Sequence, residues 1–143
     1  MSRLTQVALA MLVLSSCRSV PPAPATRINP YNVLPGKWGW RGSDDCQVAP
    51  EVVSISEREK RMYLSHFPED ENGNRQSHRE SKYTILGSIP NGLILALDGE
   101  PRLDATGGPV TWNLVLRNED EYCWRRSDWP VDHCTKPINR CEI

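Results

Sequence analysis

The strongest pattern in this chain is an alternation of apolar and polar residues with a period of two. It begins in the segment 36–41, where Trp38 and Trp40 share one face and Lys37 and Arg41 share the other. Successive side chains of a β-strand point to opposite faces, so this alternation predicts a strand with one buried face.

Six further segments carry strand patterns, with aliphatic, aromatic or β-branched residues between turn-forming residues. They are 51–56, 61–67, 82–86, 93–97, 110–116 and 122–126. No stretch of ten residues shows the 3.6-residue apolar repeat of a helix. The pattern therefore predicts an all-β fold, a small antiparallel barrel (or sandwich) of about seven to eight strands.

Two connections between these strands have distinct characters. The polar stretch 68–80 is too hydrophilic to pack, so we expect a mobile loop there. The sequence 89–92, Ile-Pro-Asn-Gly, predicts a tight hairpin turn, because proline presets the first turn angle and Asn-Gly tolerates a positive φ.

The beginning of the chain carries an export pattern. A short apolar run, 7–14, follows Arg3 and ends at a small-residue exit, which predicts a secretory signal peptide. Eight residues are too few to cross a bilayer, where about 20 are needed. An ordinary signal peptide followed by a chance cysteine is the alternative to the interpretation that follows.

The tetrapeptide Leu14-Ser15-Ser16-Cys17 resembles the lipobox of bacterial lipoproteins. The resemblance implies that residues 1–16 are removed and that Cys17 carries acyl chains, palmitate among them. Arg18, in place of an aspartate after the cysteine, resembles the outer-membrane sorting pattern. We therefore expect a protein anchored by lipid to the bacterial outer membrane, with its domain facing the periplasm.

A proline-rich segment follows the lipobox cysteine. Residues 17–34 contain Pro21, Pro22, Pro24 and Pro30, which favour extended polyproline II geometry. We expect this segment to be a tether between the lipid and a β domain at 35–143.

Four cysteines follow Cys17, and their number indicates two disulfides. Cys46, Cys123, Cys134 and Cys141 allow three connectivities in an exported chain. We expect Cys123 to pair with Cys134 and Cys46 with Cys141, because the second bridge would tie the exit of the first strand to the tail. A four-thiolate zinc site is the alternative, but the chain has no Cys-x-x-Cys pair.

Net charge narrows the choice of partners. The chain has 17 basic and 18 acidic side chains and a formal net charge of −1 at pH 7. Nucleic-acid-binding proteins usually present a basic face, so we expect no nucleic acid partner. Membrane attachment would depend on the lipid at Cys17, since each buried CH₂ contributes about 0.8 kcal/mol.

Catalytic motifs are missing from the sequence. It has no nucleophile elbow, no phosphate-binding glycine loop and no H-E-x-x-H helix, and His66, His78 and His133 are scattered. We expect no catalytic residue, no cofactor and no metal ion, and hence no enzyme.

The acidic connection 98–104 leaves one alternative open. Paired carboxylates from Asp98, Glu100 and Asp104 could serve as the acid and base of a glycoside hydrolase. The same stretch could instead hold an ion pair with Arg102 that fixes the loop.

Gly36-x-Trp38 resembles the Gly-x-Trp signature of lipocalins and their calycin relatives. The resemblance implies a barrel whose end is closed by Trp38, with an arginine from the last strand packed across the indole. Cation–ring stacking of this kind contributes about 0.5–2 kcal/mol. Arg125 and Arg126 lie on the last strand expected, and Arg126, which shares a face with Trp124, is the better match.

Large aromatic residues on strands suggest a ligand. If the barrel resembles a calyx, Trp40, Trp112 and Trp124 line or support its interior above Trp38. We therefore expect noncatalytic binding of a small apolar or amphipathic ligand at the barrel mouth. The alternatives are recognition of an envelope protein, as by small stapled lipoproteins that inhibit lysozyme, and an envelope-integrity role without a ligand.

Overall fold

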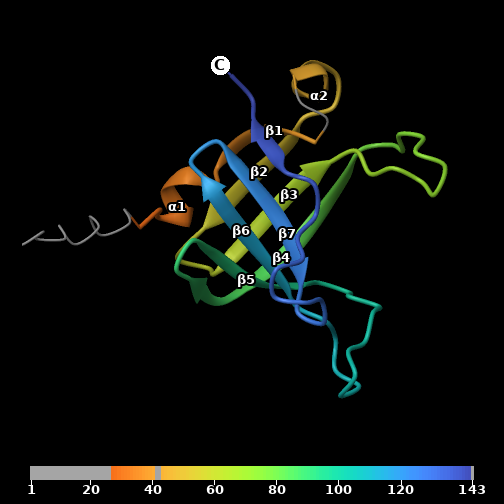
Figure 1. Ribbon diagram of the computed structural model, residues 1–143. Helices are drawn as coiled ribbons and strands as arrows, with labels where there is room; N and C mark the ends of the chain where they lie inside the picture. The colour runs from red at the N-terminus through yellow and green to blue at the C-terminus, as the bar shows by residue number, and fades with distance from the viewer. Residues whose placement is uncertain (1–26, 41–42, 143) are drawn as a thin grey trace, which may run out of the picture.

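A computed structural model describes residues 27–40 and 43–142, which form a closed antiparallel barrel (Figure 1). Each strand pairs with the next along the chain, and the last pairs with the first. The strands are β1 (Gly36–Gly39), β2 (Glu51–Ser56), β3 (Arg61–His66), β4 (Arg79–Ile89), β5 (Gly92–Leu97), β6 (Trp112–Asn118), β7 (Glu121–Arg126) and β8 (Ile138–Arg140). The expected all-β barrel is confirmed, and the sandwich is excluded.

Short helices α1 (Pro30–Val33) and α2 (Ser43–Val48) flank β1. No helix formed by the described residues has the length and apolar character needed to cross a membrane. The signal peptide, the lipobox with Cys17, and Arg18 lie outside the described residues.

The two ends of the barrel differ in their connections. At the end near α1, which we call the closed end, the tight turns 57–60, 90–91 and 119–120 join the strands. At the other end, which we call the open end, the connections are long. They comprise 40–50 with α2, 67–78, 98–111 and 127–137, and they project away from α1 in Figure 1. The open end therefore has the chain length to build a site.

Alternating side chains fill the interior of the barrel. One cluster of buried residues runs through it, contributed by Leu34 and by all eight strands. Its members on the strands are Trp38, Val53, Met62, Leu64, Tyr83, Ile85, Leu93, Leu95, Leu114, Leu116, Tyr122, Trp124 and Ile138. A small barrel of eight strands is just wide enough to be filled in this way. Trp124 is thus part of a packed core.

The extended tether expected at 17–34 is wrong for its last residues, because residues 30–33 form helix α1. Asn29 caps α1 by accepting a hydrogen bond from the Tyr31 backbone N–H at 3.0 Å, and Pro30 occupies the first helical turn, where its missing N–H costs nothing. Leu34 is fully buried. The folded domain therefore includes residues before 35.

The polar stretch 68–80 has local structure that its composition did not predict. The Asp70 carboxylate accepts hydrogen bonds from the backbone N–H groups of Asn72 and Asn74 at 2.9 and 2.8 Å. These bonds form a turn, and Glu69 and Arg75 pair across it as an isolated bridge. Strand β4 then begins at Arg79, inside the stretch expected to be a loop.

Gly92 is needed for a reason other than the one expected. It does not have a positive φ. A Cβ atom at this position would instead lie 1.9 Å from the Leu114 carbonyl oxygen on β6. The close approach of β5 and β6 therefore requires glycine, and the Asn91 side chain adds a hydrogen bond to the Leu116 carbonyl at 2.8 Å.

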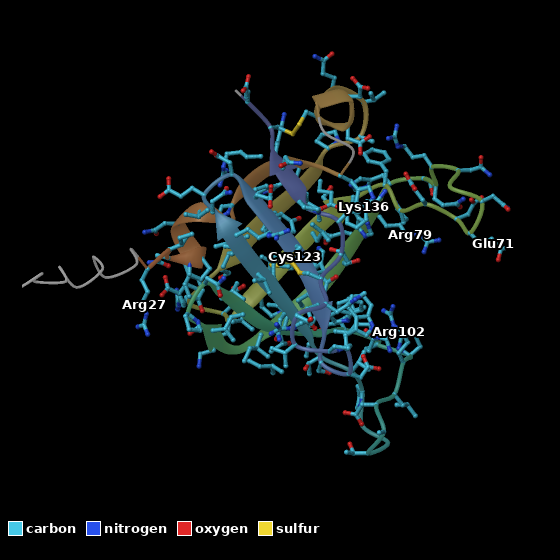
Figure 2. The ribbon with its side chains drawn as sticks, in the orientation of Figure 1. Arg27, Glu71, Arg79, Arg102, Cys123 and Lys136 are labelled. Atoms are coloured by element: carbon cyan, nitrogen blue, oxygen red, sulfur yellow. A yellow bond between two sulfur atoms is a disulfide. The ribbon has the colours of Figure 1, made fainter. Side chains whose placement is uncertain are left out.

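Both expected disulfides are confirmed. Cys46 on α2 is bonded to Cys141 just after β8, and Cys123 on β7 is bonded to Cys134 in the following connection. Figure 2 shows Cys123 in the barrel wall with its yellow bond. The first bridge closes a loop with a sequence separation of 95 and ties both ends of the domain together.

An arginine does lie over the ring of Trp38, but it is Arg140 and not Arg126. The Arg140 guanidinium carbon is 4.2 Å from the centre of the indole ring, and its N–H groups donate to the carbonyls of Val33 and Glu119. The expectation failed because the last strand is β8, which the sequence pattern did not reveal. Arg126 on β7 lies instead over the rings of Trp112 and Trp129.

Gly36 has a role in this closure. Its φ of +135° falls in the region that favours glycine, and a Cβ atom there would lie 3.4 Å from an Arg140 guanidinium nitrogen. The Gly-x-Trp triplet therefore supplies both the backbone angle and the ring that Arg140 covers.

Arg140→Ala should lower the free energy of unfolding by about 2–4 kcal/mol, because it removes the stack on Trp38 and charged hydrogen bonds to two carbonyls. The control is Arg126→Ala, which removes a partly exposed pairing with Asp128 and more distant contacts with the rings of Trp112 and Trp129, but no hydrogen bond to a backbone carbonyl, and should cost about 1 kcal/mol. Urea unfolding of both variants measures the difference. Equal losses would contradict the assignment of Arg140 as the closing arginine.

Candidate functional site

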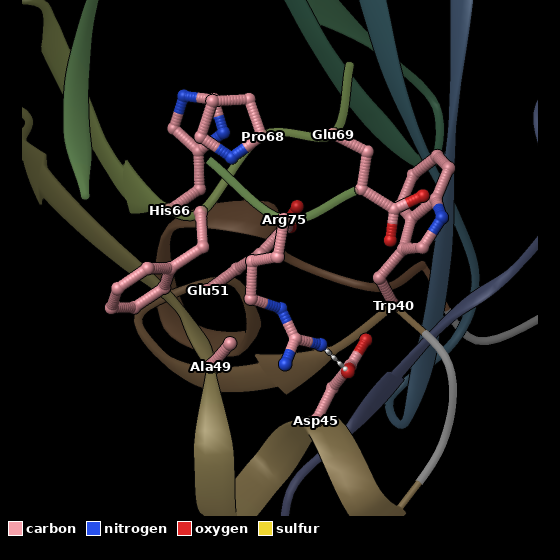
Figure 3. Close-up of a pocket in the computed structure, with 9 residues that line it drawn as sticks. Trp40, Asp45, Ala49, Glu51, His66, Pro68, Glu69 and Arg75 are labelled. Carbon is pink, nitrogen blue, oxygen red and sulfur yellow. Dashed lines mark hydrogen bonds and ion pairs between the residues drawn. The ribbon is translucent and has the colours of Figure 1, made fainter. Parts of the chain in front are cut away.

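A pocket of about 310 Å³ lies at the open end of the barrel, between α2 and the start of the 67–78 connection (Figure 3). Its lining combines apolar surface with charged groups. The lining residues are Trp40, Asp45, Ala49, Glu51, His66, Phe67, Pro68, Glu69 and Arg75. Of the tryptophans expected to surround a ligand, only Trp40 lines this pocket.

Glu51 points inward because of its position in β2. It lies directly opposite Trp38 of β1 in the register, so both side chains point to the inside of the barrel. The phenol O–H of Tyr122, a fully buried residue on β7, donates to Glu51 Oε2 at 2.7 Å. The second oxygen, Oε1, accepts no hydrogen bond from the residues that the structure describes. Within the described part of the chain, Glu51 therefore lines the pocket with one oxygen available to accept a hydrogen bond.

The surroundings of Glu51 disfavour its ionised form. Burial raises the pKa of Glu51, the hydrogen bond from Tyr122 lowers it in part, and the charge of Asp45 raises it further. Burial and the neighbouring Glu51 carboxylate also raise the pKa of Tyr122 well above its usual value. Tyr122 therefore remains a hydrogen-bond donor at neutral pH.

Glu100, at the open end as well, is a carboxyl group whose two oxygens both accept hydrogen bonds. Its side chain is 2 % exposed, and it accepts hydrogen bonds from the Arg102 guanidinium at 2.6 and 3.1 Å and from Trp112 Nε1 at 2.8 Å. Burial raises the pKa of Glu100, but these hydrogen bonds outweigh it and bring the pKa to about 2. Glu100 is thus a structural anion, and Glu51 is the group with spare capacity.

An ion pair forms one wall of the pocket. Asp45 on α2, which is almost fully buried, accepts a hydrogen bond from Arg75 Nη2 at 2.5 Å (dashed in Figure 3). The pair joins α2 to the 67–78 connection, two segments 30 residues apart in the chain. It therefore holds together the two segments that enclose the pocket.

Two serine–histidine contacts involve β3: one joins it to β4, and the other joins it to the last residue of the 67–78 connection. His66 Nε2 is 3.0 Å from Ser81 Oγ, and His78 Nε2 is 2.5 Å from Ser65 Oγ. Burial lowers the pKa of His66, as do the charges of Arg79 and His78, so His66 is neutral at neutral pH. Among the described residues, neither histidine has a hydrogen bond to a carboxylate that would complete a catalytic triad.

The carboxylates considered for hydrolysis each have a different partner. Asp98 pairs with Arg61 at 2.5 Å, and Glu100 pairs with Arg102, which is the loop-fixing ion pair left open from the sequence. Asp104 accepts bonds from Thr106 in a local turn. Within 27–40 and 43–142, no group of three or more His, Cys, Asp or Glu side chains is arranged to hold a metal ion.

Other sequence-predicted residues lie elsewhere in the barrel. Trp38 closes the end near α1, Trp124 is in the core against Tyr83, and Trp112 contacts Trp124 and Trp129. Sequence reasoning missed Glu51. The signal was present, because Glu51 shares a strand face with Val53, and a charged residue on the apolar face of a strand is unusual.

Nothing matches this chain in comparisons with protein-family models, with curated proteins or with solved structures. The functional argument therefore rests on the chain's own residues.

Glu51→Gln should stabilise the protein at pH 7. A carboxyl group whose pKa is higher in the folded chain supports the fold below its unfolded pKa, and this support is lost as the pH rises through the folded pKa. Glutamine keeps an oxygen for Tyr122 but cannot ionise. Urea unfolding should show a higher free energy of unfolding for the variant than for the wild type at pH 7. This difference should vanish at about pH 3, where Glu51 is protonated in both the folded and the unfolded chain.

The matched control for this experiment is Glu59→Gln, which removes a carboxylate from an exposed turn at the closed end. Its stability should follow the wild type across the pH range. A Glu51→Gln protein less stable than wild type at pH 7 would show that the ionised carboxylate supports the fold.

Proposed function

We propose that this chain is a lipid-anchored envelope protein whose barrel mouth binds a small amphipathic ligand without converting it. One observation carries the proposal: Glu51 points into a partly apolar pocket, its ionised form is disfavoured, and one of its carboxylate oxygens has no hydrogen-bond donor among the described residues. Groups with perturbed pKa values in a concave, partly apolar pocket are typical of functional sites.

The dimensions of the pocket favour a small ligand. A volume of about 310 Å³ is at the lower end of the range for small-molecule sites, which extends from about 300 to 1,000 Å³. Packed side chains fill the barrel below the pocket. The ligand is therefore a compact molecule at the mouth and not a long acyl chain inserted along the barrel axis.

The polar groups around the pocket favour binding over catalysis. Arg75 is engaged by Asp45, Tyr122 keeps its proton, and the serine–histidine contacts of His66 and His78 have no carboxylate partner among the described residues. Such groups fix the orientation of a ligand by charge and hydrogen bonding.

Anchoring by lipid rests on the sequence 14–17 and on Arg18. The described chain enters the barrel through α1 at the closed end. A lipid on Cys17 is compatible with the open end and its pocket lying away from the membrane, in the outer-membrane setting and periplasmic orientation that we propose.

Recognition of an envelope protein is the second candidate. Val48 on α2, Leu103 in the 98–111 connection and Val131 in the 127–137 connection are 68 %, 61 % and 83 % exposed. These three large apolar side chains lie on three of the four long connections at the open end. Large apolar side chains exposed on several connections at the same end of the barrel support a protein partner there.

Ligand binding should change tryptophan emission through Trp40. Three compounds of six carbon atoms each, hexylamine, hexan-1-ol and hexanoate, test the pocket without presuming the charge of the head group. We expect saturable emission changes on titrating the full chain with at least one of them, because Trp40 lines the pocket. The change should be lost in Trp40→Phe.

The control variant is Trp129→Phe, which alters a tryptophan outside the pocket and should keep the response. No saturable change in tryptophan emission with any of the three compounds would refute the proposed binding function and favour protein recognition.

Cys17→Ala should abolish metabolic labelling of the protein with palmitate and cause the protein to be released or misprocessed. The physical reason is that the modest net charge of −1 supplies no electrostatic attraction to an anionic surface, so attachment depends on the acyl chains. Labelling that persists in this variant would contradict acylation at Cys17.

A further inference from the structure

We propose that the pocket at the open end selects a primary ammonium group on a short apolar stem, and that Glu51 Oε1 accepts a hydrogen bond from this group. The inference rests on the proposed binding function and names the chemical class of its ligand.

The charges that line the pocket favour a cation. Three described lining residues carry carboxylates, and two of them, Asp45 and Glu69, have partners of their own, so Glu51 is the carboxylate on which a preference for a cation rests. One described lining residue, Arg75, carries a guanidinium. The Arg75 guanidinium is already bonded to Asp45 at 2.5 Å. His66, the remaining titratable lining residue, is neutral at neutral pH. An anionic head group in this pocket would meet like charge at Glu51, whereas a cation would be attracted.

The hydrogen bonds of Glu51 indicate where the ammonium group would bind. Oε2 of Glu51 is occupied by the Tyr122 hydroxyl, and Oε1 is the oxygen left for a donor from the pocket. An ammonium group brings three N–H donors and a positive charge, so its bond to a carboxylate is charge-assisted and stronger than a bond from a neutral hydroxyl. A carboxylate head group has no donor to offer. The bound cation would also offset the cost of ionising Glu51 in its buried surroundings.

The remaining lining residues of the pocket suit the apolar stem of the ligand and its positive charge. Trp40 and Phe67 contribute aromatic rings, and Ala49 and Pro68 contribute aliphatic surface. Aromatic rings attract a cation placed over their faces, and apolar surface is favoured against a short hydrocarbon stem. The small volume of the pocket limits the stem to a few carbons.

Calorimetric titration of the full chain at pH 7 with hexylamine, hexan-1-ol and hexanoate separates charge from stem, because all three have six carbon atoms and their apolar stems differ by at most one carbon. We expect hexylamine to bind at least about tenfold more tightly than hexan-1-ol, as a charge-assisted hydrogen bond predicts, and hexanoate to show no saturable binding. Added sodium chloride should weaken hexylamine binding and leave hexan-1-ol binding unchanged.

Glu51→Gln tests the acceptor directly. This variant removes the charge and keeps an oxygen for Tyr122, so the affinity for hexylamine should fall to that for hexan-1-ol while hexan-1-ol affinity is retained. The matched control is Glu59→Gln, which removes the same charge at the closed end and should bind hexylamine as the wild type does.

The outcomes distinguish this inference from the function on which it rests. Hexan-1-ol or hexanoate binding as tightly as hexylamine, with the emission change lost in Trp40→Phe, would overturn the ammonium preference and support the binding function. Hexylamine binding that survives Glu51→Gln unchanged would overturn the role of Glu51. No saturable binding by any of the three compounds would overturn both proposals.

Discussion

The closure of this barrel depends on the packing of Arg140 over Trp38. β1 and β8 are short, and only Trp38–Arg140 and Gly39–Asn139 are paired in their register. So few backbone pairs hold β1 and β8 together only weakly, and side chains must stabilise this seam between the first and last strands. The Trp38 indole donates to the Leu34 carbonyl at 2.9 Å, its ring lies edge-on against Tyr122 at 4.8 Å, and Arg140 covers it. The bond from Cys46 to Cys141 then holds the residue after β8 against α2.

The contact between β1 and β8 also positions Glu51, the carboxyl group proposed to bind the ligand. Tyr122, which packs against Trp38, is also the donor to Glu51, and Glu51 lies opposite Trp38 in the register. A change in the seam would therefore move the phenol that orients the Glu51 carboxylate. The stability of the barrel and the geometry of the pocket are coupled through one buried tyrosine. A carboxyl group with a raised pKa opposes folding at neutral pH, and a ligand cation is the kind of partner that would reverse this cost.

The scaffold was largely predictable from the sequence, because burial imposes its pattern on every strand. Alternation located seven strands, and the expectation that one bridge ties the exit of the first strand to the tail led to the correct pairing of the disulfides. β8 escaped prediction because its three residues follow a stretch rich in proline and charge, and a strand so short shows no alternation. Missing β8 led directly to the choice of Arg126 instead of Arg140, since the closing arginine was sought on the last strand expected.

The pocket was less predictable, and the reason is physical. Its walls come from segments without a periodic pattern, such as α2 and the 67–78 connection, and they meet through the pairing of Asp45 with Arg75 across 30 residues. Nothing in local sequence specifies such a pairing. Only Glu51 stands on a patterned element, as a charged residue on the apolar face of β2. Glu100 shows that an inward carboxylate by itself is no sign of a site, because Arg102 and Trp112 satisfy it fully. The distinguishing property of Glu51 is its incomplete satisfaction, which only the three-dimensional arrangement of its neighbours reveals.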